Sequence, residues 1–174
     1  MAKTIARMVR RVSRTYADGG DPPPLGGHAA ALAAFGGYAA AWAGAVRWSG
    51  RSLPARPEPL DLLLTSVATF RLSRLVSKGS VLSPLRAPFT EYEGPQGPAE
   101  LEEKPRDGAR GVVGSLLTCP FCVSVWTVST LTGAGLLWPR ATRTVTGALT
   151  ALAGADALQF AYTAMQQKTE TEGD

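Results

Sequence analysis

An uninterrupted run without a charged side chain extends from Gly111 to Pro139. About twenty apolar residues, at a rise of ~1.5 Å per residue, are enough to cross the hydrocarbon core of a bilayer, and this run is longer. The run therefore predicts a membrane-spanning helix. It also contains Cys119 and Cys122, the two cysteines of the chain.

The distribution of charge along the chain predicts further helices of this kind. With 18 Lys and Arg against 14 Asp and Glu among 174 residues, the average composition is that of a basic soluble domain. Charged side chains are nevertheless scarce in four windows, which predict spans at about 27–46, 60–77, 115–138 and 144–165. We therefore expect an all-α polytopic membrane helical bundle of about four transmembrane helices, forming one domain over 27–165.

Basic residues predict the orientation of these spans. The first window consists mainly of Ala and Gly, and we interpret it as an uncleaved helix because Arg10 and Arg11 lie too far ahead of it for a twin-arginine signal. With the N-terminus in the cytoplasm, the loop 78–110 and the polar tail 166–174 are cytoplasmic, which agrees with the positive-inside bias. The basic residues then left outside are Arg47, Arg51, Arg56, Arg140 and Arg143. The chain is thus expected in the bacterial inner (cytoplasmic) membrane, multi-pass, with both termini cytoplasmic.

Residues 1–26 predict a basic amphipathic helix followed by a Gly- and Pro-rich linker. A helix would place apolar residues such as Met8 and Val12 on one face and Arg7 and Arg11 on another, which suits attraction to anionic lipids at the bilayer surface. A disordered basic tail that only enforces topology is the alternative. The basic residues line the membrane edges without an accompanying aromatic face, so we expect no binding of nucleic acid.

Three charged residues fall inside predicted spans. Arg71 and Arg74 share one face near the cytoplasmic end of the second span, where long side chains snorkel readily to the headgroups. Asp156 lies in the middle of the fourth span, at a depth within reach of Arg71. An unpaired carboxylate there is costly, so we expect Asp156 to be paired, protonated or facing a polar cavity. Together the three residues form a candidate intramembrane charge cluster.

Small residues and a long loop indicate protein contacts. Small residues recur at four-residue spacing in the first and last spans, which lets helices approach closely in lipid and favours self-association. The positions are Gly36, Ala40 and Gly44, and Gly147, Ala151 and Ala155. The second half of the cytoplasmic loop, 93–110, is rich in Gly, Pro, Glu and Lys and is expected to be mobile, and a protein partner is expected to bind in this loop.

Cys119 and Cys122 form a candidate thiol pair with three interpretations. The Cys-Pro-Phe-Cys sequence is also found in glutaredoxin-like redox proteins, but no strand–helix–strand order surrounds it here, which excludes a thioredoxin fold. A membrane redox protein would usually carry a second cysteine pair. Two thiolates supply half of a zinc site, and His28 is a candidate third ligand. Structural packing as small apolar groups is the interpretation we favour, with no cofactor.

Three ordered blocks resemble a known family. These are Thr69 to Val76 (TFRLSRLV), Pro84 to Phe89 (PLRAPF) and Leu116 to Trp126 (LLTCPFCVSVW). Over about residues 60–165 the chain is similar to small bacterial integral membrane proteins classified only as a domain of unknown function, found in spore-forming bacilli, actinobacteria and some of their phages. The resemblance implies an integral membrane protein in which the arginine pair and the Cys-Pro-aromatic-Cys sequence are hallmark positions, with no established activity.

These observations favour a non-catalytic membrane component that acts through membrane association or protein contacts. A thiol-dependent redox or metal-binding membrane protein is the first alternative. A pore-forming protein of the holin type is the second, because the chain is compact and its outer loops are short. No catalytic residue is identified.

Overall fold

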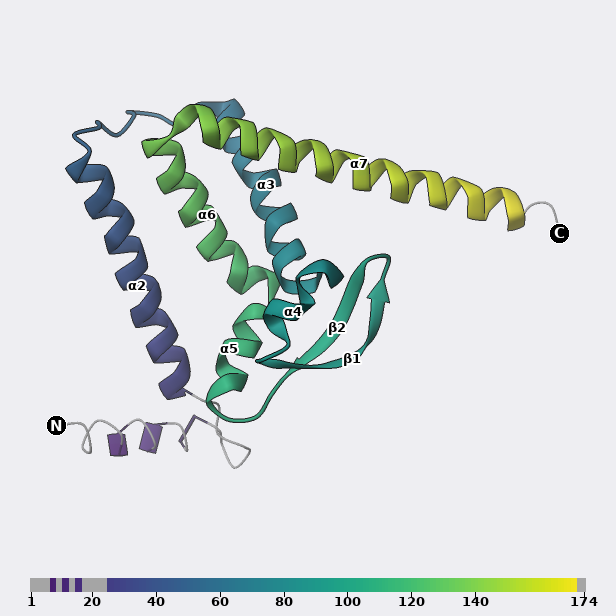
Figure 1. The fold of residues 1–174 in the computed structure, drawn as a ribbon, viewed down its shortest axis with the longest axis horizontal. Helices are drawn as coiled ribbons and strands as arrows, with labels where there is room; N and C mark the ends of the chain where they lie inside the picture. The colour runs from purple at the N-terminus through teal and green to yellow at the C-terminus, as the bar shows by residue number, and fades with distance from the viewer. Residues whose placement is uncertain (1–6, 9–10, 13–14, 17–24, 172–174) are drawn as a thin grey trace.

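The computed structural model describes residues 7–8, 11–12, 15–16 and 25–171. Most of the predicted amphipathic segment 1–26 therefore lies outside the described residues, as does the end of the predicted tail. Arg7, Met8, Arg11, Val12 and Tyr16 are helical and exposed. The element labels used below are those of Figure 1.

The structure is mostly helical, as predicted. Four long helices correspond to the four predicted windows, and shorter ones lie between them. Proline occupies the first helical position in α3 and α6, where its missing N–H has no helical partner to lose. In chain order the helices are α2 (Leu25–Trp48), α3 (Pro59–Lys78), the 3-10 turn η1 (Ser80–Leu82), α4 (Ser83–Arg86), α5 (Ala109–Leu117), α6 (Pro120–Leu137) and α7 (Pro139–Thr171).

Among the described residues, two helices are long and apolar enough to cross a membrane, α2 and α6. The expectation of four such helices is not matched on this criterion. α3 carries Asp61, Arg71, Arg74 and Lys78, and α7 carries charges at both ends and at Asp156. α3 and α7 therefore carry more charged residues than α2 and α6 do. Their positions in the chain nevertheless match the second and fourth predicted windows.

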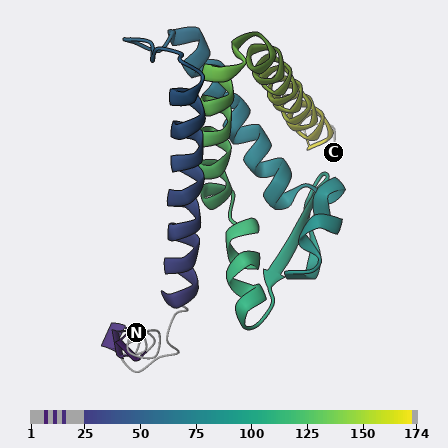
Figure 2. The ribbon, with the colours of Figure 1, turned by 60° about the vertical axis from the view of Figure 1, so that its left-hand side comes forward.

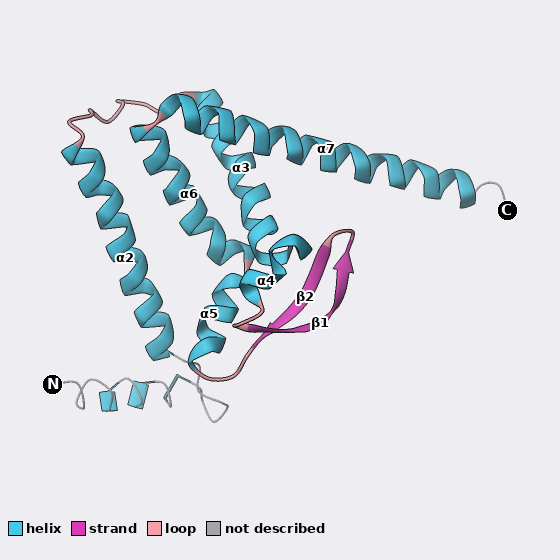
Figure 3. Cartoon of the chain, in the orientation of Figure 1, coloured by secondary structure: helices cyan, strands magenta, loops and turns pink. Residues whose placement is uncertain are grey.

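The all-α expectation was wrong in the loop between the second and third spans. Strands β1 (Thr90–Gly97) and β2 (Glu100–Pro105) pair as an antiparallel hairpin, and α5 follows directly (Figure 3). The segment expected to be mobile is thus folded. Its turn contains Ala99 at φ 61°, a left-handed conformation that non-glycine residues adopt rarely. The carbonyl of Ala99 accepts a hydrogen bond from the Ser80 amide at 2.9 Å, which ties the turn to η1.

The two ends of the molecule differ. Figure 1 shows α2, α6 and α3 running between an end formed by the α2–α3 and α6–α7 connections and an end formed by α4, α5 and the hairpin. α7 starts at the first end, packs against α3 and α6, and then projects away from the other helices (Figure 1). Beyond Asp156, the described residues of α7 whose exposure is defined are exposed.

Aromatic side chains hold α2 against α6. The rings of Phe35 and Tyr38 each lie 5.2 Å from the ring of Trp126, and the hydroxyl groups of Tyr38 and Thr130 are 2.6 Å apart. Trp42 lies directly over Gly133, where an added Cβ would be 2.4 Å from the indole. The small residues expected to mediate packing play no such part within the chain, because added Cβ atoms at Gly36, Gly44 and Gly147 would meet open space.

Candidate functional site

Basic residues along one face of α3 separate into two sets of partners. Arg71, Arg74 and Lys78 follow one another at spacings of three and four residues and so lie on neighbouring turns. The Arg71 guanidinium faces α7, whereas Arg74 and Lys78 face β2. These three basic residues in the second half of α3 therefore all have acidic partners, one on α7 and two on β2.

Arg71 and Asp156 form an ion pair between α3 and α7. Arg71 Nε lies 2.6 Å from Asp156 Oδ2, and both side chains are partly buried. The N–H of Arg71 Nε is not aligned for a hydrogen bond with this oxygen, so the contact is an ion pair by distance alone. Two of the three residues in the predicted charge cluster are thus brought together.

Arg74, the third member of that cluster, does not join this pair. Its Nε donates to Glu100 Oε1 at 3.0 Å, and its Nη2 contacts the second oxygen of the same carboxylate. Lys78 Nζ, one turn further on, lies 3.4 Å from Glu102 Oε2. Two alternate residues of β2 therefore fix the hairpin to the end of α3.

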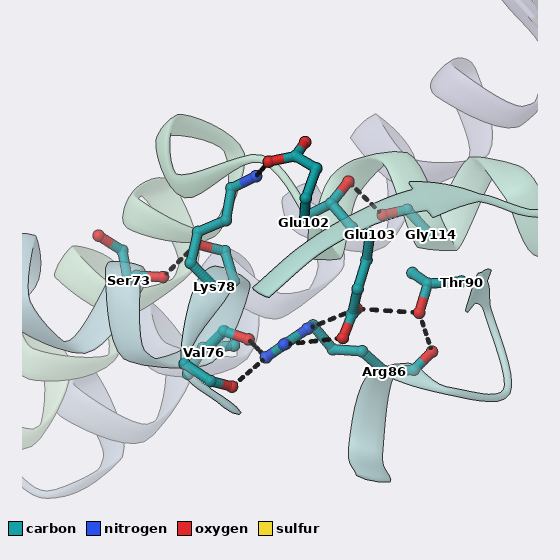
Figure 4. A network of polar contacts seen from close by, with 11 residues as sticks. Ser73, Val76, Lys78, Arg86, Thr90, Glu102, Glu103 and Gly114 are labelled. Atoms are coloured by element: carbon teal, nitrogen blue, oxygen red, sulfur yellow. Dashed lines mark hydrogen bonds and ion pairs between the residues drawn. The ribbon is translucent and has the colours of Figure 1, made fainter. Parts of the chain in front are cut away.

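Arg86 and Glu103 form the buried centre of this arrangement (Figure 4). Arg86 Nε and Nη2 donate to the two Glu103 oxygens at 2.9 and 3.0 Å, and the Arg86 side chain is only 1% exposed. Arg86 Nη1 also donates to the carbonyls of Val76 and Gly79 at 2.9 and 3.0 Å. Thr90 Oγ1 donates to Glu103 Oε2 at 3.0 Å. One guanidinium thereby connects the end of α3, Gly79 just ahead of η1, and β2.

We call this set of residues the hairpin clamp: Arg74, Lys78, Arg86, Thr90, Glu100, Glu102 and Glu103. Its buried part was missed from the sequence, because Arg86 was placed in a cytoplasmic loop, 78–110, and Glu103 in the half of that loop expected to be mobile. The signal that was available is the position of Arg86 inside the Pro84–Phe89 block, one of the three blocks on which the resemblance rests.

α5, the helix that precedes the cysteines, packs against the base of the hairpin. Gly114 lies so close to the hairpin that an added Cβ would be 2.3 Å from the Phe89 carbonyl oxygen and 3.2 Å from Pro105 Cα. α5 ends at Leu117 and α6 begins at Pro120, so the backbone breaks between two helices just before the proline. The break places the cysteine pair where α6 starts, next to the clamp end of the molecule.

Cys119 caps the first turn of α6. Its Sγ accepts a hydrogen bond from the Cys122 amide at 3.3 Å, and both thiols are free and half-buried. His28 is exposed in the first turns of α2. In the described part of the chain, no group of three or more His, Cys, Asp or Glu side chains is placed to hold a metal ion. The candidate zinc ligands Cys119, Cys122 and His28 are therefore not brought together.

A second ion pair, not considered from the sequence, joins α3 to α7 at the opposite end. Arg143 Nε and Nη2 donate to the two oxygens of Asp61, each at 2.8 Å. The hydrogen bonds with this carboxylate raise the pKa of the Arg143 guanidinium above its ordinary value. Between the two ion pairs, Thr150 Oγ1 donates to the Leu64 carbonyl at 3.3 Å. Polar contacts therefore follow the α3–α7 interface from Asp61 to Asp156.

Comparison with known proteins identifies the family of this chain. It belongs to the family described as "Protein of unknown function (DUF1360)", whose model matches residues 63–162. The sporulation protein YjcA of Bacillus subtilis (strain 168) is 35% identical over 79 residues, which cover 38% of this chain and 60% of that protein. The chain thus matches less than two thirds of that relative's length. No solved structure matches the chain.

The matched region has a clear relation to the site. Both partners of the Arg71–Asp156 pair, the hairpin clamp and the cysteine pair lie within 63–162, whereas α2 and Asp61 lie outside it. The clamp and the cysteine pair therefore lie in the part of this chain that the family model matches, and α2 lies ahead of it.

Proposed function

We propose that this member of the DUF1360 family is a multi-pass protein of the bacterial cytoplasmic membrane that acts without catalysis, by presenting a rigid polar module to a protein partner. The module consists of η1, α4, the β1–β2 hairpin and α5. The hairpin clamp fixes it to the end of α3. The transmembrane domain is proposed to extend over 27–165.

The observation that carries the membrane part of this proposal is the exposure of α2. A core helix of a soluble protein is apolar and mostly buried, but Val46 is the one residue of α2 that the chain buries. Leu32, for example, is 72% exposed. Such a helix fits lipid better than water, because a contiguous apolar surface of this kind is costly in water. α6, which contains no charged residue, supports the same interpretation.

The orientation follows from the positive-inside bias. We propose four spans, with the hairpin module and both termini in the cytoplasm and the loops around Ser52 and Ala141 outside. α3 and α7 enter the membrane in this proposal as a pair, joined by Asp61–Arg143 and Arg71–Asp156. Their charges are then neutralised within the protein instead of facing lipid.

Two experiments test the membrane proposal. The protein should stay in the membrane pellet after alkaline carbonate extraction, which releases peripheral proteins. Topology reporters at Ser52 and Ala141 should be active outside the cell, and a reporter inserted at Ala99, in the hairpin turn, should be active inside. Release into the alkaline supernatant, or an outside signal at Ala99, would contradict the proposal.

The name of a similar protein suggests the cellular process in which this chain acts. YjcA is named as a sporulation protein, and we propose that this chain also acts during spore formation in its host. The test compares a deletion strain with its parent in vegetative growth and in the yield of heat-resistant spores. A deletion that lowers spore yield without slowing growth is expected, and equal spore yields would contradict the assignment.

A thiol function is the second candidate, favoured by the geometry of the cysteine pair. Cys119 caps α6 through its own sulfur and lies one helical turn from Cys122, an arrangement in which the helix N-terminus favours a thiolate. Trapping of a mixed disulfide with another cellular protein would support this candidate. A pair that stays reduced in oxidant-treated cells, with the same mobility on gels as the double Ser variant, would leave the non-catalytic proposal in place.

A further inference from the structure

The groove between the second halves of α2 and α6 is the cavity that neither the clamp nor the thiol pair explains. Its volume is about 730 Å³, within the range usual for ligand pockets. It arises because aromatic residues fill the first part of the α2–α6 interface, whereas on either side of Trp42 the α2 wall is formed by the small residues Ala39 and Ala43. Val128 and Leu136 of α6 form the opposite wall. The walls suit a hydrocarbon chain.

The open end of this groove is basic. Arg47, in the last turn of α2, and Arg51, just beyond it, both line the groove. Neither guanidinium forms an ion pair with any acidic side chain in the described ranges of the chain. Four arginines elsewhere, Arg71, Arg74, Arg86 and Arg143, have carboxylate partners. Arg56 and Arg140 form no ion pair among the described residues either, but they do not line the groove. The two groove arginines are therefore available for an anion from outside the chain.

The level of these arginines agrees with a lipid headgroup. The C-terminal ends of α2 and α6 lie at the same end of the molecule (Figures 1 and 2). Trp48 ends α2 close to Arg47 and Arg51, Trp138 caps α6, and both indoles are exposed. Indole rings prefer the interface between hydrocarbon and water. In the proposed orientation this end is outside, where the positive-inside bias disfavours arginine, so a specific anion accounts for Arg47 and Arg51 being there.

We propose that the α2–α6 groove binds one anionic phospholipid, with an acyl chain along Ala39 and Ala43 and the phosphate between Arg47 and Arg51. The inference rests on the proposed membrane insertion. It differs from the expected attraction of residues 1–26 to anionic lipid, which concerns the other face of the membrane and needs no cavity. Two guanidiniums at the mouth of an apolar groove recognise a phosphate ester with an attached chain, not a soluble anion alone.

The test measures retained lipid on the full chain. The protein is reconstituted in nanodiscs containing equal parts of phosphatidylglycerol and phosphatidylcholine, released into a mild detergent, and weighed by native mass spectrometry. The wild-type chain should retain one phosphatidylglycerol. The double variant Arg47→Gln/Arg51→Gln should lose this retention about tenfold or more, because two charge-assisted contacts are removed.

Two further variants separate the groove from general charge. Arg56→Gln/Arg140→Gln removes the same charge from the same end of the molecule without touching the groove, and it should retain lipid like the wild type. Ala43→Phe keeps both arginines but fills the groove, and it should lose the lipid. Equal losses in the two arginine double variants, or wild-type retention in Arg47→Gln/Arg51→Gln, would overturn the proposal.

Alkaline extraction of the same proteins keeps this result apart from the membrane proposal. A wild-type chain that stays in the membrane but retains no phosphatidylglycerol refutes the groove site alone. A wild-type chain that alkali releases refutes membrane insertion, and the groove site with it.

Discussion

Replacing Glu103 by Gln should detach the hairpin from α3. The Glu103 carboxylate accepts three hydrogen bonds, two from Arg86 and one from Thr90, and its side chain is 5% exposed. The substitution preserves the shape of the side chain but leaves the Arg86 charge buried without a counter-ion. Breaking a buried ion pair in this way costs about 3–5 kcal/mol.

Hydrogen exchange of the β1 and β2 amides measures this loss directly. Since every 1.4 kcal/mol is a factor of about ten, exchange in Glu103→Gln should accelerate by roughly two to three and a half orders of magnitude. The matched control is Glu91→Gln on the same hairpin, because Glu91 pairs with Lys104 and Arg106 at 3.5 Å and is 47% exposed. An exposed pair is worth about 0–1 kcal/mol, so exchange there should change less than about fivefold.

The double variant Arg86→Met/Glu103→Leu tests the reasoning further. With both side chains apolar, no buried charge is left without a counter-ion, so part of the protection of the hairpin amides that Glu103→Gln loses should return. Recovery should be incomplete, because the carbonyls of Val76 and Gly79 lose their donor and a buried unsatisfied group costs about 1–3 kcal/mol. If Glu103→Gln exchanges no faster than Glu91→Gln, the clamp does not hold the hairpin and the argument fails.

Three further predictions concern the helices, the turn and the thiols. In detergent unfolding, Arg71→Gln and Asp156→Asn should each destabilise the chain by about 1–3 kcal/mol, and the double variant should lose less than their sum; strict additivity would refute an energetic coupling of this pair. Ala99→Gly should stabilise the hairpin by up to about 1 kcal/mol, because φ 61° suits glycine, and should therefore slow exchange of the hairpin amides. Faster exchange would show that the turn is not strained. Cys119→Ser/Cys122→Ser should lower thermal stability but leave the reporter topology unchanged, and loss of function with either single Ser change would instead indicate a reactive pair.

The long helices could be predicted because their signals are local. Scarcity of charge marks each window, and proline at Pro59, Pro120 and Pro139 marks the start of the helix that follows. The reach of Asp156 to Arg71 could be anticipated for a different reason. A charged side chain inside an apolar window is costly unless it is paired, and the windows contain few residues of opposite charge that could pair with it.

The hairpin could not be predicted in the same way. β1 (Thr90–Gly97) contains Pro95 and two register irregularities, and β2 (Glu100–Pro105) has three glutamates, so neither strand has alternating apolar residues. What stabilises them is contact with Arg74, Lys78 and Arg86, which lie 26, 24 and 17 residues before their glutamate partners in β2. Burial of Arg86 is likewise invisible without knowledge of Glu103, since an isolated arginine is expected to be exposed.

The same pairing logic decides whether α3 and α7 can lie in a membrane. Taken alone, each helix holds charges that would cost at least about 2.5 kcal/mol apiece near the bilayer centre, and neither has the composition of a spanning helix. Taken together, Asp61 and Arg143 neutralise each other at one end of the interface, Arg71 and Asp156 do so further along it, and Arg74 is neutralised by Glu100 of the hairpin. Since the clamp holds Glu100 in β2, the proposed insertion of α3 in lipid depends on the hairpin as well. On the proposed topology, loss of the clamp should therefore weaken α3–α7 packing as well as the hairpin itself.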